Sequence, residues 1–233
     1  MRRRSAPLWL FDLDNTLHNA SHAIFPAISS NMNAFLARVL GDGETPADPD
    51  TVNAIRQQYY ARYGVTMLGM VRHHGVRADE FLHEVHHFDD LGSMIRYERG
   101  LKKLLRRLPG KKILLTNAPR AYSGRVLRHM GLHRHFDAHI PVEAMRVHGQ
   151  LQPKPSRPYL RKLLATYGKR ASDCVLVEDS IENLRAAKQE GLRTVWITGY
   201  TPAHQLKKSA ACADVKVKSV MQLPRQSYRL FAR

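Results

Sequence analysis

The sequence predicts an α/β fold built on a parallel β-sheet, and three observations support this prediction. Short apolar runs recur along the chain, amphipathic helical segments separate most of them, and glycines follow several of these helical segments. The short runs are apolar throughout, without polar residues at alternate positions. This pattern is typical of parallel strands that helices cover on both faces.

The expected elements follow one another in a regular order. We expect strands at residues 8–11, 113–115, 138–140, 174–177 and 194–197, and an edge strand at 214–217. We expect helices at residues 100–108, 121–130, 158–167 and 181–190, the last three of which stop at Gly131, Gly168 and Gly191. A short last helix from Ser219 and a frayed segment at 225–233 complete the chain.

One long interval breaks the alternation of strands and helices. Between residues 18 and 95 no segment has the pattern of a strand, whereas residues 28–40, 52–63 and 79–87 have helical patterns. A loop rich in Gly, Asp and Pro at residues 41–50 separates the first two. We therefore expect two domains, an α/β core of residues 1–17 and 96–233 and an all-helical insert of residues 18–95.

Composition excludes several classes of protein. The longest uninterrupted apolar run, residues 6–11, is far shorter than the roughly 20 residues of a membrane-spanning helix, so no membrane partner is expected. The basic start at residues 1–4 is not followed by the apolar segment of an export signal, and the two cysteines have no disulfide or zinc-site spacing. These observations predict a cytoplasmic protein.

The 233 residues include 37 Lys and Arg against 20 Asp and Glu, a net charge of +17. The excess is concentrated at residues 2–4, 99–112 and 204–233. Clustered basic residues are one property of nucleic-acid-binding proteins. However, leucines form an apolar stripe along residues 100–108, so Lys and Arg there are expected to cover the solvated side of an amphipathic helix. We therefore do not expect nucleic acid as a partner.

Two carboxylates directly follow the first expected strand. Asp12 and Asp14 are two residues apart, so in an extended backbone their side chains point to the same side. The carboxyl end of a strand in an open parallel sheet is where ligands bind. Two acids at this spacing repel each other unless a cation lies between them or one of them holds a proton. The alternative is an Asx turn with only local hydrogen bonds.

Chemically related residues follow other strands or precede helices. Thr116 and Asn117 follow the second strand, Lys154 lies between two prolines ahead of a helix, and Glu178 and Asp179 follow the strand at 174–177. Hydroxyl, amide and ammonium groups can hold phosphoryl oxygens, and acids can complete a cation site. Each residue also fits a local role, such as a helix cap. Their occurrence together, and in this order, favours a single phosphate and metal site.

These motifs resemble those of the haloacid dehalogenase (HAD) superfamily of phosphatases. The resemblance covers residues 12–16 (DLDNT), Thr116-Asn117, Lys154 and Glu178-Asp179, in order. It implies a Rossmann-like parallel-sheet core with an inserted all-helical (C1-type) cap. Residues 59–66, 79–86 and 177–184 are similar to the pyrimidine 5′-nucleotidase branch, which implies that nucleoside monophosphates are the substrates.

The resemblance implies a role for each matching residue. Asp12 would be the nucleophile that forms an aspartyl phosphate, and Asp14 would be the general acid and base. Mg²⁺ would be held by the carboxylates of Asp12 and Asp179 and by the backbone carbonyl of Asp14, while Glu178 would order a metal-bound water.

The resemblance also implies how the phosphate would be bound. Thr116, the Asn117 region and Lys154 would neutralise the oxygens of the transferring phosphoryl group. In the insert we expect Tyr63, Thr66 and Phe88 to contact the substrate. A dehalogenase is disfavoured because that branch lacks the second acid, here Asp14. A phosphomutase shares all of these motifs, and a phosphatase for another small metabolite also remains open. A basic nucleic-acid-binding protein on the same fold would be expected to have lost a catalytic residue.

Overall fold

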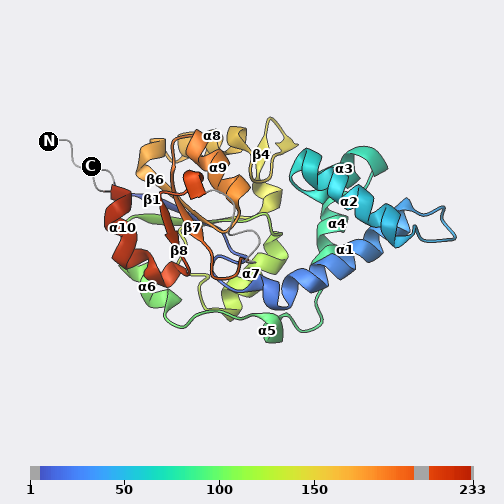
Figure 1. Ribbon diagram of the computed structural model, residues 1–233, viewed down its shortest axis with the longest axis horizontal. Coiled ribbons are helices and arrows are strands. Elements are labelled where there is room, and N and C mark those ends of the chain that lie inside the picture. The colour runs from blue at the N-terminus through green and yellow to red at the C-terminus, as the bar shows by residue number, and fades with distance from the viewer. Residues whose placement is uncertain (1–5, 202–209, 232–233) are drawn as a thin grey trace. The chain divides into compact units, whose positions relative to one another are not determined.

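The computed structural model describes residues 6–201 and 210–231, and these residues form two compact units. One unit comprises the described residues of Met1–Ala20 and Ile95–Arg233, and the other is Ser21–Met94 (Figure 1). The basic residues 2–4 and the first part of the basic stretch 204–233 lie outside the described residues.

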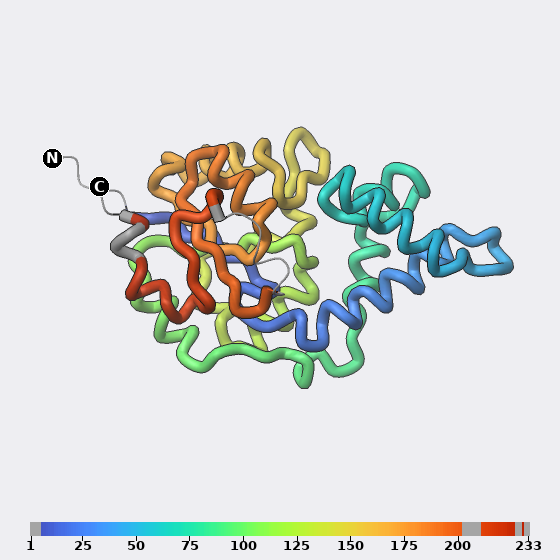
Figure 2. Tube along the Cα trace, in the orientation of Figure 1, coloured from blue at the N-terminus to red at the C-terminus, as the bar shows by residue number. Residues whose placement is uncertain are grey.

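The first unit is built on a six-stranded sheet in which every pairing is parallel. Its strands are β1 (Leu8–Phe11), β2 (Lys111–Leu115), β3 (Ala138–Ile140), β6 (Cys174–Glu178), β7 (Arg193–Ile197) and β8 (Val215–Val217). They lie in the order β3-β2-β1-β6-β7-β8, so β1 occupies the interior of the sheet although it is the first strand of the chain (Figure 2). The predicted parallel α/β fold is confirmed.

Helices cover both faces of this sheet (Figure 1). They are α6 (Leu101–Arg107), α7 (Arg120–His129), α8 (Arg157–Thr166), α9 (Ile181–Gln189) and α10 (Leu223–Phe231). Leu8 and Leu10 of β1 belong to a core cluster with apolar side chains of α8 and α9. The alternate residues Trp9 and Phe11 are also fully buried, and their rings stack with centroids 6.1 Å apart. Burial on both faces explains why the strands are apolar at every position.

Two parts of this unit differ from expectation. A small antiparallel hairpin, β4 (Arg146–Val147) and β5 (Gln150–Leu151), was not predicted because two-residue strands carry no periodicity. Its turn residues His148 and Gly149 have φ of 49° and 77°, as a tight hairpin turn requires. The chain end is also more regular than predicted: after a 3₁₀ turn, α10 continues to Phe231 because Leu223 and Leu230 are buried.

The second unit is entirely helical, as predicted for this interval. It contains α1 (Ile24–Leu40), α2 (Pro49–Tyr63), α3 (Thr66–His74), α4 (Ala78–Val85) and α5 (Leu91–Met94). Asp48 caps α2 by accepting hydrogen bonds from the backbone N–H groups of Asp50 and Thr51, both at 2.9 Å. The sequence did not predict α3, which is only nine residues long. Across the described residues, no helix combines the length and apolar character needed to cross a membrane.

Candidate active site

The site lies at the carboxyl ends of β1 and β6, which are neighbours in the sheet. Phe11 and Val177 are register partners, and the ladder extends one bond further, from the N–H of Asp12 to the carbonyl of Val177 at 3.0 Å. The residues that follow both strands therefore emerge together. This pairing brings Asp12 next to Glu178 and Asp179, although 166 residues or more separate them in the sequence.

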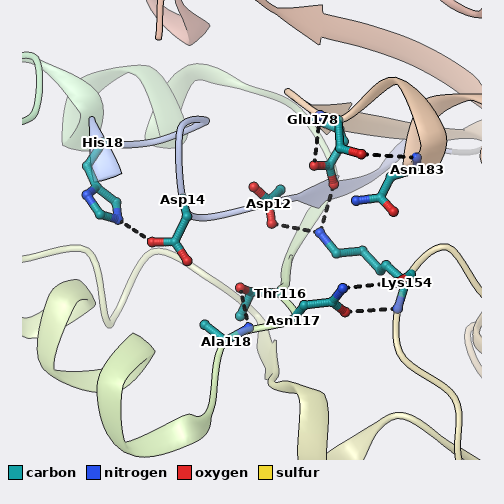
Figure 3. Close-up of polar contacts among 10 residues, drawn as sticks. Asp12, Asp14, His18, Thr116, Asn117, Ala118, Lys154, Glu178 and Asn183 are labelled. Carbon is teal, nitrogen blue, oxygen red and sulfur yellow. Dashed lines mark hydrogen bonds and ion pairs between the residues drawn. The ribbon is translucent and has the colours of Figure 1, made fainter. Parts of the chain in front are cut away.

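Lys154 joins the two strand ends. Its Nζ donates to Asp12 Oδ1 and to Glu178 Oε2, both at 2.7 Å (Figure 3). Asn117 holds the lysine backbone through two hydrogen bonds: its Nδ2 donates to the carbonyl of Lys154 at 3.0 Å, and its Oδ1 accepts from the N–H of Lys154 at 2.9 Å. The amide of Asn117 thus positions Lys154. The sequence had not indicated this contact.

The charges in this cluster are buried. Asp12 and Lys154 are each 6% exposed, and Glu178 is 1% exposed. Burial, followed by the charge of Glu178, raises the pKa of Asp12 to about 7 from an ordinary 3.8. Burial and the charge of Glu178 also raise the pKa of Asp179. Burial lowers the pKa of Lys154, but Asp12 and Glu178 outweigh it and the net shift is upward, so the ammonium form is retained.

The cluster fits a hard divalent cation. Carboxylate oxygens of Asp12, Glu178 and Asp179 all lie within 4.8 Å of one another, and no other such group of His, Cys, Asp or Glu occurs among the described residues. Three acids lie beside one lysine, so this lysine alone does not balance their negative charge when all three are ionised. An all-oxygen set of this kind suits Mg²⁺, which binds through a few carboxylates and completes its octahedron with water or phosphate.

The carboxylate of Asp14 is not part of this group. Its Oδ1 instead accepts a hydrogen bond from the hydroxyl of Tyr122 at 2.5 Å, and it lies 2.8 Å from Nε2 of His18 (Figure 3 shows the His18 contact). The chain turns after Leu13, and Asn15 adopts a left-handed φ of 57°. The prediction that the Asp12 and Asp14 side chains point to the same side assumed an extended backbone, and the backbone is extended only as far as the end of β1.

Tyr122 and His18 were both missed by sequence analysis. Tyr122 is 2% exposed and His18 is fully buried. Burial and the nearby charge of Asp14 raise the pKa of Tyr122 well above its ordinary value, so the hydroxyl stays protonated. No sequence signal links Tyr122 to Asp14, since 108 residues separate them. The four-residue spacing of Asp14 and His18 was a signal, but no helix was expected there.

Thr116 directly follows β2, a neighbour of β1 in the sheet. It is 1% exposed, its N–H donates to the carbonyl of Ile140 at 3.1 Å, and its Oγ1 accepts from the N–H of Ala118 at 3.1 Å. The hydroxyl is thus held at the carboxyl edge of the sheet, at the first turn towards α7 (Figure 3).

The three residues proposed from the insert lie in the helical unit. Tyr63 is partly exposed, its hydroxyl lies 2.7 Å from Nε2 of His73, and the guanidinium of Arg72 lies 4.9 Å from its ring centroid. Thr66 and Phe88 are 8% and 6% exposed. Contacts of these residues with a substrate stay a prediction.

The fold and site together define a Rossmann-like α/β protein with a polar cluster at the carboxyl ends of parallel strands. A family model described as haloacid dehalogenase-like hydrolase matches residues 8–191. The chain therefore belongs to the haloacid dehalogenase-like hydrolase family.

Solved structures share the fold over nearly the whole chain. A 2-haloacid dehalogenase from Pseudomonas syringae pv. Tomato DC3000 is 21% identical, with a TM-score of 0.58 and coverage of 96% of this chain and 98% of the other. A HAD phosphatase from Thermococcus onnurineus is 18% identical, with a TM-score of 0.61 and coverage of 94% and 96%. CbbY from Rhodobacter sphaeroides, solved with phosphate, is 19% identical, with a TM-score of 0.62 and coverage of 94% and 96%.

Proposed function

We propose that the protein is a Mg²⁺-dependent phosphomonoesterase that acts through an aspartyl-phosphate intermediate. The observation that carries the proposal is the buried cluster in which Lys154 bonds Asp12 and Glu178 while Asp179 lies within reach of both acids. A buried nucleophilic carboxylate beside a fixed cation and further acids fits phosphoryl transfer, in which positioning and charge neutralisation supply most of the catalysis.

Asp12 and Asp14 divide the chemistry. An oxygen of Asp12 forms a bond to phosphorus while the bond from phosphorus to the ester oxygen breaks, and Asp14 gives that leaving oxygen its proton. Water then attacks the aspartyl phosphate, Asp14 takes the proton from this water, and inorganic phosphate leaves with Asp12 regenerated. The separate hydrogen-bond partners of the two carboxylates support this division, because they place the two acids in different environments.

The remaining residues of the site bind the phosphoryl group and the metal ion. Lys154, positioned by Asn117, and the hydroxyl of Thr116 hold the phosphoryl oxygens. Asp12 and Asp179 would hold Mg²⁺ together with the backbone carbonyl of Asp14, and Glu178 would order water beside it. When bound, Mg²⁺ reduces the repulsion between the anionic nucleophile and the anionic phosphate.

The substrate class we propose is a pyrimidine nucleoside 5′-monophosphate. The similarity of residues 59–66, 79–86 and 177–184 to the pyrimidine 5′-nucleotidase branch supports this assignment. The helical unit would serve as the cap, and Tyr63, Thr66 and Phe88 would contact the nucleotide. The guanidinium groups of Arg72 and Arg62 lie 4.9 and 5.3 Å from the ring centroid of Tyr63, and such cations suit the phosphate of a nucleotide. A phosphomutase is the alternative, because it uses the same motifs.

The first test measures phosphate release from an aryl phosphate with Mg²⁺ and with EDTA. The wild-type protein should be active only with Mg²⁺, and Asp12→Asn should lose turnover while it keeps its circular dichroism spectrum. Full activity in Asp12→Asn would contradict the mechanism.

The second test compares UMP, CMP, dTMP, AMP, GMP and sugar phosphates, with product analysis. UMP, CMP and dTMP should be hydrolysed fastest. Equal rates for all substrates would contradict the nucleotide assignment, and a rearranged phosphate ester in place of free phosphate would indicate a mutase.

A further inference from the structure

The environment of Asp14 contains a feature that the proposed mechanism does not use. Two side chains from distant parts of the chain meet at one oxygen of this carboxylate: the hydroxyl of Tyr122 in α7 and Nε2 of His18. Both side chains are buried, and the Asp14 side chain is 15% exposed. Asp14 is therefore held at its inner oxygen while the carboxyl group still reaches the surface of the core unit.

We infer that Tyr122 and His18 are positioning residues that fix the rotamer of Asp14 and thereby aim its proton at the leaving oxygen. This inference rests on the proposed phosphatase function. A carboxylate on a single Cβ–Cγ bond otherwise rotates freely, and proton transfer requires hydrogen-bond distance and alignment. Since Oδ1 is the oxygen that receives both contacts, the transferred proton is assigned to Oδ2.

The surroundings of the two ring nitrogens of His18 indicate which of them carries the proton. Its Nδ1 is buried and has no hydrogen-bond partner. An orphaned buried N–H costs more than an orphaned lone pair on an imidazole, so the proton belongs on Nε2, where it is donated to Asp14. Tyr122 also donates to Oδ1, which accepts hydrogen bonds both when Asp14 is ionised and when its proton is on Oδ2. Both groups are thus donors, and both act on the same oxygen.

Tyr122 is held rigidly enough to serve this role. Ser123, its neighbour in α7, is fully buried and donates from Oγ to the carbonyl of Pro119 at 2.7 Å. The same Oγ lies 2.8 Å from Nε2 of His139, the middle residue of β3. The first turn of α7 is therefore tied to the sheet, and the burial of Tyr122 restricts rotation of its side chain away from Asp14.

The experiment compares kcat/KM for two esters that differ in leaving group. Phenyl phosphate needs a proton from Asp14, whereas 2,4-dinitrophenyl phosphate releases a stable phenolate without one. For Tyr122→Phe we expect about a 10- to 100-fold loss with phenyl phosphate and less than about a threefold loss with the dinitrophenyl ester. Because kcat/KM reports the steps up to the first bond cleavage, slow hydrolysis of the intermediate does not mask the effect.

Matched variants separate positioning from structure. His18→Leu should show the same leaving-group dependence, and His18→Gln, which keeps an N–H donor, should recover most of the phenyl phosphate activity. Tyr167→Phe, a half-buried tyrosine at the end of α8, is the control and should leave both rates unchanged.

Each outcome decides between the proposals. Equal losses with both esters, or no loss with either, in a folded Tyr122→Phe protein would overturn the positioning role while leaving the phosphatase proposal intact. A wild-type protein inactive with both esters in Mg²⁺ would overturn the phosphatase proposal, and the positioning role with it.

Discussion

The ion pairs at the site of the sheet unit are buried, whereas those of the helical unit are exposed. In the sheet unit, Asp12, Lys154 and Glu178 are almost completely buried and bond to one another. In the helical unit, the ion pair of Arg38 and Glu84 is exposed, with side chains 58% and 39% accessible. Solvent screens an exposed pair, whereas a buried charge depends on its partner alone. We therefore expect removal of a charge from the buried pairs to lower the free energy of unfolding much more than removal of a charge from the exposed pair.

Apolar contacts hold the helical unit together instead. Phe35 of α1 and Phe81 of α4 are buried and meet edge to face, with ring centroids 5.3 Å apart. Gly69 of α3 lies directly against the ring of Tyr59 of α2. Close packing, and not charge, is the feature of this unit that substitutions should disturb.

Removal of Lys154 is expected to have the largest effect. Lys154→Met leaves Asp12 and Glu178 buried without their cation, so we expect the free energy of unfolding at neutral pH, measured in urea without Mg²⁺, to fall by about 3–5 kcal/mol. Phosphatase activity should be lost as well. Lys103→Met, on the exposed side of α6, is the control and should change neither quantity. An unchanged stability of Lys154→Met would show that the cluster is solvated.

The dependence of stability on pH should be the next largest effect. Asp12 has a pKa of about 7 when folded, against an ordinary 3.8, so between these values the folded protein binds more protons than the unfolded chain. In EDTA, Asp12 should therefore lower the free energy of unfolding as pH rises through this window, by up to about 1.4 kcal/mol per pH unit. Asp12→Asn should remove this contribution, and Mg²⁺ should reduce it. Identical pH profiles for both proteins in EDTA would contradict the raised pKa.

A packing defect in the helical unit should lower the free energy of unfolding by less than the removal of Lys154 does. In Gly69→Ala the new Cβ would lie 2.1 Å from Cγ of Tyr59, so the tyrosine ring must move. This movement disturbs the contact of the Tyr59 hydroxyl with Nε2 of His74, which is 2.7 Å long in the wild-type protein. We expect a loss of about 1–3 kcal/mol in urea unfolding. Gly124→Ala on α7 is the matched control, because its Cβ would meet only Arg128 at 3.5 Å. This control should be neutral or slightly stabilising. Equal stability of the two variants would show that α2 and α3 pack loosely.

The exposed ion pair should give the smallest effect. Arg38→Ala removes a 2.7 Å contact with Glu84, and the exposure of both side chains predicts a change of less than about 1 kcal/mol in thermal or urea unfolding. High salt should shrink the difference further. A loss as large as that of Lys154→Met would remove the contrast between the two units.

Much of the fold was predictable because it is encoded locally. The apolar runs marked β1, β2, β3, β6 and β7, and the absence of such runs marked the helical interval, since burial on both faces leaves a pattern in the sequence. The elements that were missed are short. The two-residue strands of the β4–β5 hairpin are too short for a periodic signal, α3 has a glycine in its interior, and the end of α10 depends on the burial of Leu230.

The site was predictable in part for the same reason. Asp12, Lys154 and Glu178 belong to motifs at strand or helix ends, so their place in the linear order indicated a common edge of the sheet. Tyr122 lies within a helix and carries no motif. Its contact with Asp14 depends on how α7 packs, which no local pattern records.

The sequence by itself determined the parallel sheet, the helical interval and the set of acids, lysine and threonine at the strand ends, because each is a property of neighbouring residues. Only the tertiary structure decided how these groups pair. It joined Lys154 to Asp12 and Glu178, committed the Asn117 amide to the lysine backbone, and gave the Asp14 carboxylate partners of its own, Tyr122 and His18. The physical reason is that hydrogen bonds and pKa shifts depend on distances between residues far apart in the chain, and strand register and helix packing set those distances.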